Sequence, residues 1–213
     1  MDYKDLTISE FISHLSSSEP VPGGGGASAL AAALGLALGN MVGNLTLGKK
    51  KYANVQEDII RLNNISQKLQ ESFLLLIDKD AEAFKPLSKA YGLPKDTCEL
   101  LEKREKIFEE ALVNASAAPI EIMKSCCEAL DILDEYAAKG TTIAISDVAV
   151  GAVFLKSALL GASLNVFINT GLMKNRAAAE KFNDEADRMI RDHGDVGDRI
   201  FSAIFKKFRN PRR

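Results

Sequence analysis

The chain has 213 residues, with 27 Lys and Arg against 29 Asp and Glu and a net charge of −2. That length fits one domain with a substantial core, and the near-neutral charge argues against a dedicated nucleic-acid-binding protein. Two histidines, His14 and His193, exclude a three-histidine zinc site and disfavour histidine-based catalysis. The three cysteines form no CxxC pair, and the first residues lack the pattern of a signal peptide. We therefore expect a cytoplasmic protein with reduced thiols, no bound metal and no nucleic-acid partner.

Helical patterns follow one another along the chain, and no segment has the pattern of a strand. Thr7–Glu10 (TISE) has the form of a capping box, which predicts a short helix that ends by Ser16–Ser18. The Pro- and Gly-rich turn Pro20–Gly26 follows it. Apolar periodicity then predicts further helices at about Gly26–Leu47, Val55–Ala90, Asp96–Ala118 continuing to Lys139, Ile145–Asn169, and from Asn175 onward.

Proline and glycine mark expected interruptions. Pro119 should break or kink its helix, and Gly194 and Gly197 are weak points of the last one. No repeat or low-complexity linker divides the chain. The pattern predicts one all-α domain over residues 1–213, an antiparallel helical bundle with long helices.

Two of the predicted helices lack charge over long stretches. Residues 20–48 and 157–173 contain no charged side chain, and about 20 apolar residues suffice to cross a membrane. However, the first stretch is rich in Ala and Gly and both contain Asn, so we interpret them as buried, tightly packed helices and expect no membrane partner. Small residues recur at i, i+4 in the first stretch and should let another backbone approach closely; they are Ala27, Ala31, Gly35, Gly39 and Gly43.

Asp80 is the most informative single residue, because it interrupts an apolar stripe. Leu76 lies one helical turn before it and Phe84 one turn after it, which places the carboxylate on the core-facing side of the helix. The neighbouring charges Asp78 and Glu82 should be solvated. Desolvation should raise the pKa of Asp80. This side chain is either a structural Asp capped by a neighbouring helix or a general acid/base in a dry cleft.

Other patterns each allow a structural and a ligand-binding interpretation. The run Gly23–Gly26 is either a flexible turn or an anion-binding helix start, and Lys49–Lys51 beside Tyr52 is either a solvated turn or a site for a carboxylate-bearing ligand. Ser146 and Asp147 have the form of an N-cap pair. Ser157, Gly161, Asn165 and Asn169 repeat at i+4, which indicates inter-helix hydrogen bonds or a ligand-facing wall.

Taken together, these segments resemble the cyclodeaminase/cyclohydrolase family. The order and spacing of the motifs match over nearly the whole chain, and the joint pattern is specific although each piece alone is not. The matching segments are Pro20–Ala27 (PVPGGGGA), Asn44–Tyr52 (NLTLGKKKY), Asp80–Phe84 (DAEAF), Ala144–Asp147 (AISD) and Leu164–Asn169 (LNVFIN). The fourth glycine, the alanine after it and Tyr91–Lys95 (YGLPK) look more like the stand-alone bacterial cyclohydrolases than the fused domains.

The resemblance implies an all-α fold, a homodimer and a tetrahydrofolate derivative as substrate, with no permanently bound cofactor and no metal. It implies hydrolysis of 5,10-methenyltetrahydrofolate to 10-formyltetrahydrofolate, or alternatively closure of formiminotetrahydrofolate with release of ammonia. The family's catalytic carboxylate corresponds to Asp80. Substrate-binding residues are expected at Gly23, Gly24, Gly25, Gly26, Lys49, Lys50, Tyr52, Ser146, Asp147, Asn165 and Asn169. One departure is Thr141, where many relatives have Asn.

A hypothesis from another class is a non-catalytic helical dimer that binds folate. Such a protein would keep the small-residue helix faces but would not need a carboxylate in the apolar stripe. Asp80 therefore argues against it.

Overall fold

The computed structural model describes residues 2–209, and over this range every regular element is helical. A 3₁₀ turn at Tyr3–Asp5 (η1) precedes α1 (Ile8–Leu15), and two more 3₁₀ segments, η2 (Lys50–Val55) and η3 (Thr142–Ala144), join longer helices. Those longer helices are α2 (Gly24–Thr46), α3 (Gln56–Tyr91), α4 (Cys98–Lys139), α5 (Ile145–Leu172), α6 (Arg176–His193) and α7 (Val196–Arg209). The all-α prediction is confirmed.

Most helix limits lie where local sequence signals put them. Thr7 and Glu10 form the predicted capping box at the start of α1. Gly194 and Gly197 were expected as weak points, and the chain divides there into α6 and α7. Pro119 was expected to break or kink its helix. The break is wrong, because α4 continues as one helix of 42 residues in which Pro119 is buried, and the kink stays a prediction.

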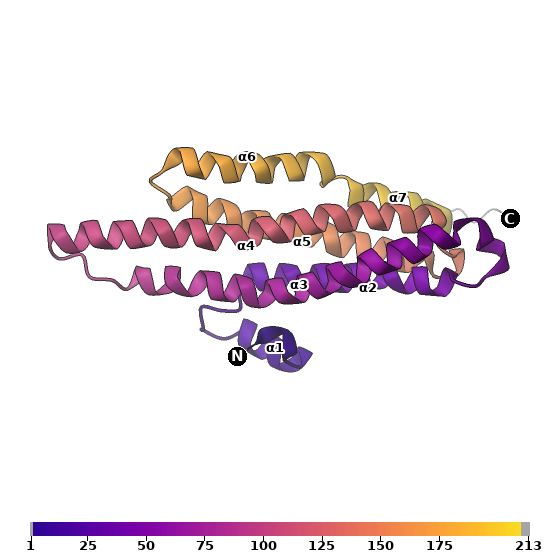
Figure 1. The fold of residues 1–213 in the computed structure, drawn as a ribbon, viewed down its shortest axis with the longest axis horizontal. Helices are drawn as coiled ribbons and strands as arrows, with labels where there is room; N and C mark the ends of the chain where they lie inside the picture. The colour runs from indigo at the N-terminus through magenta and orange to yellow at the C-terminus, as the bar shows by residue number, and fades with distance from the viewer. Residues whose placement is uncertain (1, 210–213) are drawn as a thin grey trace.

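From α2 to α6, each helix runs antiparallel to the helix before it, as predicted. Figure 1 shows α3 and α4 side by side over most of their length, with α2 and α5 behind them and α6 and α7 along one edge. The backbones of α2 and α5 approach most closely at Gly35 and Gly151, where a Cβ on either residue would collide with the other's carbonyl oxygen. Glycine is therefore required at this crossing.

The small-residue stripe of α2 does not form a single face, contrary to expectation. Gly35 meets α5, whereas Gly39 and Gly43 meet side chains of α4 and α3, and Ala27 is partly exposed. A step of four residues turns an α-helix by about 40° beyond one full turn, so the stripe winds around α2. The glycines thus serve several neighbours in turn.

The two charge-poor helices pack against each other. Gly24–Thr46 and Thr142–Leu172 are each long and apolar enough to cross a membrane, but 61% of the most apolar stretch of the first and 50% of that of the second is buried. Burial on this scale agrees with the interpretation of both as core helices. The other residues of these stretches are partly or fully exposed.

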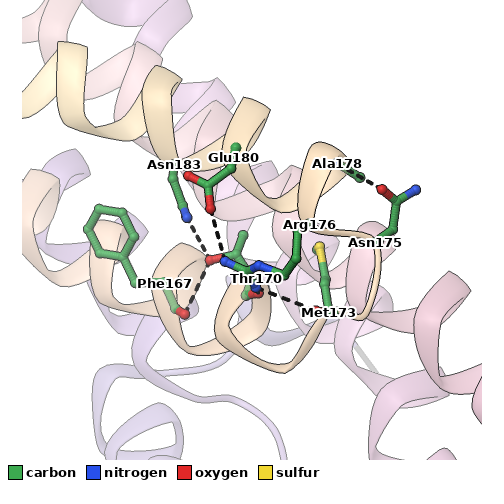
Figure 2. A network of polar contacts seen from close by, with 8 residues as sticks. All are labelled: Phe167, Thr170, Met173, Asn175, Arg176, Ala178, Glu180 and Asn183. Carbon is green, nitrogen blue, oxygen red and sulfur yellow. Dashed lines mark hydrogen bonds and ion pairs between the residues drawn. The ribbon is translucent and has the colours of Figure 1, made fainter.

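A polar network closes the turn between α5 and α6 (Figure 2). Arg176 donates to the Thr170 carbonyl oxygen at 2.8 Å and pairs with Glu180 at 3.0 Å. The Asn175 side chain caps α6 by accepting from the Ala178 amide at 3.1 Å. This network satisfies the last carbonyls of α5 and so fixes the end of the helix that carries Asn169.

The N-terminal segment is fastened to α3. The Tyr3 amide donates to the Asp78 carboxylate at 2.5 Å, and Lys4 lies 3.7 Å from the same carboxylate. Asp78 is therefore not the plain solvated charge that the sequence suggested. It helps to hold the loop that leads to the start of α2.

Candidate active site

A cavity of about 220 Å³ lies where the N-terminus of α2 meets α3, α4 and the C-terminal part of α5. It is lined by Pro20, Val21, Gly23, Gly24, Asp80, Phe84, Ala115, Pro119, Asn165, Ile168 and Asn169. Among these described lining residues, Asp80 is the one ionisable side chain. The walls otherwise combine apolar groups with two amides, the composition expected of a small-molecule site.

Asp80 is partly buried and is held by the start of α2. Its Oδ2 accepts a hydrogen bond of 3.0 Å from the Gly26 amide. Burial raises the pKa of Asp80 to about 6, against the opposing effect of this hydrogen bond. The carboxylate is therefore capped by a neighbouring helix, as one interpretation of the sequence had it. It also faces a cavity, and its role as a general acid/base stays a prediction.

The glycine run permits this contact. A Cβ on Gly25 would collide with the Asp80 carboxylate, and a Cβ on Gly24 would lie 3.2 Å from Asn165 Nδ2. Gly23 is the N-cap of α2, and Gly24–Gly26 form its first turn, so the run is not the flexible turn that was one of its interpretations. The glycines let α3 and α5 bring polar side chains against the positive end of the α2 dipole.

Pro119 shapes the cavity wall because it has no backbone N–H to donate. A proline in a helix leaves the carbonyl four residues earlier without its usual donor, which here is the carbonyl of Ala115. Asn169 Nδ2 donates to that oxygen at 3.1 Å. With its NH₂ group committed in this way, Asn169 is held in one orientation at the cavity wall.

Asn165 and Asn169 both make hydrogen bonds and both line the cavity, and their contact with a ligand stays a prediction. Asn169 makes an inter-helix hydrogen bond, whereas Asn165 Nδ2 donates within α5 to the Gly161 carbonyl oxygen at 2.9 Å, and both line the cavity. Sequence reasoning missed Pro119 and Ala115 as parts of this wall. The signal was present in the proline itself, but its partner on α5 is 54 residues away from Ala115 along the chain.

The predicted cationic group lies at the opposite end of the bundle. Lys49 Nζ donates to Thr141 Oγ1 at 3.2 Å, so the residue that departs from the family pattern contacts this lysine. The Thr142 amide donates to the Tyr52 hydroxyl at 3.0 Å, and hydrogen bonding from Thr142 lowers the pKa of Tyr52 to about 8. Within residues 2–209, Lys49, Lys50 and Lys51 form no ion pair. A second cavity of about 350 Å³ beside Tyr52 opens here.

Ser146 and Asp147 also lie at this end, in the first turn of α5. The N-cap of α5 is Ala144, which makes no side-chain cap hydrogen bond, so the predicted N-cap pair is wrong. Asp147 instead places a negative charge near the positive end of the α5 dipole.

The sequence-predicted site thus divides into two groups at the two ends of α2. Gly23–Gly26, Asp80, Asn165 and Asn169 lie at one end; Lys49, Lys50, Tyr52, Ser146 and Asp147 lie at the other. The 23 residues of α2 span about 35 Å at 1.5 Å per residue. A single copy of the chain therefore does not bring the two groups together. Among the described residues, no three His, Cys, Asp or Glu side chains are grouped as a metal would require.

Known proteins resemble the chain over almost its full length. The family model described as Formiminotransferase-cyclodeaminase matches residues 7–188. The chain is 38% identical over 201 residues to a methenyltetrahydrofolate cyclohydrolase of Methylorubrum extorquens, which covers 94% of this chain and 97% of that protein. It is 30% identical over 188 residues to a formimidoyltransferase-cyclodeaminase of Mus musculus, of which it spans only 35%. The crystal structure of a formiminotetrahydrofolate cyclodeaminase from Thermotoga maritima shares the fold, with a TM-score of 0.82 over 95% of this chain and 98% of that one at 23% identity.

Proposed function

The chain belongs to the formiminotransferase-cyclodeaminase family of folate metabolism, and on this premise we propose that it is a methenyltetrahydrofolate cyclohydrolase. The observation that carries the proposal is the Asp80 carboxylate, the one ionisable group among the described residues of the α2–α5 cavity. The relative from Methylorubrum extorquens, matched over nearly its full length, bears the same activity in its name.

The reaction needs a base and then an acid. Water attacks the carbon between N5 and N10 of the cationic substrate, and Asp80 takes a proton from that water as the C–O bond forms. The C–N5 bond then breaks, Asp80 returns its proton to N5, and the hydroxyl proton leaves to solvent as the formyl group forms on N10. A pKa of about 6 suits a group that must both accept and donate a proton near neutral pH.

Electrostatics favour the same assignment. An ionised carboxylate in a poorly hydrated cavity stabilises the cationic methenyl substrate more strongly than it would in water. The amide oxygens of Asn165 and Asn169 add further acceptors at the cavity wall. We propose that these groups and the glycine run contact the reacting end of the folate.

The deciding experiment follows the near-ultraviolet absorbance of 5,10-methenyltetrahydrofolate with purified protein against a protein-free blank. We expect loss of the methenyl chromophore, and we expect Asp80→Asn to slow it by about 10²–10⁴-fold, the usual contribution of acid–base catalysis. Glu82→Gln, which alters an exposed carboxylate of the same helix, is the matched control. If Asp80→Asn keeps turnover within about tenfold of wild type, Asp80 is not the acid/base.

The alternative activity uses the same groups. In a formiminotetrahydrofolate cyclodeaminase, N10 would attack the formimino carbon and Asp80 would protonate the departing ammonia. The Thermotoga maritima protein of this fold is described by that activity and is matched over 98% of its chain. Appearance of the methenyl chromophore from formiminotetrahydrofolate, together with release of ammonia, would identify this reaction instead. A rise in melting temperature with folate but no turnover would indicate a binding protein.

A further inference from the structure

Two prolines lie inside long helices, and the carbonyls that they leave without a helical donor have different surroundings. Pro86 lies in α3 and Pro119 in α4. Because proline has no N–H, the carbonyl four residues earlier, that of Glu82 or of Ala115, loses its usual donor. Glu82 and Pro86 are exposed, so water is available at that turn. Ala115 is only 4% exposed, so its carbonyl needs a partner from the protein.

That partner is Asn169 of α5, and the bond determines which atom of its side chain is left for the cavity. Asn169 Nδ2 donates to the Ala115 carbonyl oxygen at 3.1 Å. An asparagine carries its donor and its acceptor on separate branches, so the NH₂ group is committed to α4. Within residues 2–209, Asn169 Oδ1 accepts no hydrogen bond, and it is not one of the fully buried polar atoms that lack a partner. This oxygen is therefore an accessible acceptor of a residue that lines the cavity.

The side chains around the cavity offer acceptors in preference to donors. Asp80 contributes a carboxylate, and Asn165 also has its NH₂ group committed, because its Nδ2 donates to the Gly161 carbonyl oxygen at 2.9 Å. None of the described lining residues is cationic. A folate carries N–H groups on its pterin ring and carboxylates at its glutamate end. A wall of acceptors pairs with the first and repels the second.

The proline is what makes the asparagine necessary at this place. An ordinary residue at position 119 would satisfy the Ala115 carbonyl with its own amide, and Asn169 would not be needed for that purpose. Its side chain would then be free to turn either its NH₂ group or its oxygen toward the cavity. Pro119 removes this choice.

We propose that Pro119 is a positioning residue of this site, and that the oriented Asn169 oxygen accepts a hydrogen bond from an N–H group of the pterin ring. Asn169 touches the substrate, whereas Pro119 acts through it. The identity of the ligand rests on the proposed function, but the orientation of Asn169 does not.

The first test is steady-state kinetics with 5,10-methenyltetrahydrofolate. Asn169→Ala should raise KM by about 3–10-fold, the contribution of one hydrogen bond. Its kcat should stay within about twofold of wild type, because these ring N–H groups keep their protons throughout the reaction. Pro119→Ala should raise KM by about threefold, although it removes a helix-breaking residue and should not lower the melting temperature. Pro86→Ala, which alters the exposed proline of α3, is the matched control and should leave KM unchanged.

The double variant shows whether Pro119 acts through Asn169. If it does, adding Pro119→Ala to Asn169→Ala should raise KM no further. An effect of Pro119→Ala that persists in the Asn169→Ala background would overturn the proposal, because it would assign the effect to contact between the proline ring and the ligand. A Pro119→Ala variant with the wild-type KM would also overturn it. So would an Asn169→Ala variant that lowers kcat and leaves KM unchanged, because this would place the oxygen against the reacting atoms.

The second test needs no turnover and follows hydrogen exchange of side-chain amides by ¹⁵N NMR. Exchange at Asn169 Nδ2, assigned by its loss in Asn169→Ala, should be slower in wild type than in Pro119→Ala. Asn165 Nδ2, which donates within α5, is the internal reference and should not change. Equal exchange at Asn169 in both proteins would overturn the positioning role. If wild type neither converts nor binds methenyltetrahydrofolate, the proposed function fails, while the exchange measurement still decides the orientation of Asn169.

Discussion

Replacing Asp80 by Asn should stabilise the protein at neutral and alkaline pH. The folded structure raises the pKa of Asp80 from 3.8 to about 6, so the folded state binds this proton more tightly than the unfolded state. The ionised form therefore costs stability, and the cost grows as pH rises from below 4 to above 6. About two pKa units at 1.36 kcal/mol each give a cost of roughly 3 kcal/mol at pH 8 and about 1 kcal/mol at pH 4.5.

Asn keeps an acceptor for the Gly26 amide and carries no charge, so Asp80→Asn removes this cost. The variant's free energy of unfolding should exceed that of wild type by about 2 kcal/mol less at pH 4.5 than at pH 8. For a chain of this size, the gap between the two melting temperatures should therefore shrink by about 4–8 °C. Thermal unfolding by circular dichroism at both pH values measures it. Glu82→Gln, an exposed carboxylate of the same helix, is the control and should show no such change. An advantage that is equal at both pH values would refute the desolvation argument.

Three further changes test the contacts around the two groups of predicted site residues. Gly25→Ala should destabilise the protein by about 1–3 kcal/mol through collision with the buried carboxylate, while Gly23→Ala, whose Cβ would meet nothing within 4 Å, should be neutral in thermal unfolding. Asn169→Ala should lower the free energy of unfolding by about 1–3 kcal/mol, because it leaves an α4 carbonyl unpaired. The loss should be smaller in a Pro119→Ala background, where the restored amide can bond that carbonyl. A double-mutant cycle in urea measures the coupling between the two residues. Tyr52→Phe should remove the phenol that titrates at about pH 8 in ultraviolet difference spectra; an unchanged titration curve would contradict the hydrogen bonds assigned to it.

Local signals were enough to predict the helices. The capping box at Thr7, the glycines between α6 and α7, and the apolar stripe of α3 each act within a few residues, so they can be recognised without the fold. The same stripe placed Asp80 against the core, as the structure has it. Pro119 was misjudged because its effect depends on a distant residue: α4 continues through it where Asn169 satisfies the carbonyl that it frees.

The division of the site between two ends was accessible from the sequence by simple arithmetic. A helix from about Gly26 to Leu47 extends more than 30 Å at 1.5 Å per residue, so the glycine run and the lysine cluster at its two ends could not both contact one small ligand within one bundle. What the sequence could not supply was the direction in which the remaining apolar surface points, because that depends on which sides of α2 and α5 the other helices cover.

The uniform apolarity of α2 and α5 exceeds what packing within one bundle requires. A helix at the edge of a bundle needs only one apolar stripe, and its outer side is normally polar. In α2 the outer side is as free of charge as the inner side, although only 61% of its most apolar stretch is buried within one copy. The core of one copy therefore does not account for the remaining apolar residues of α2.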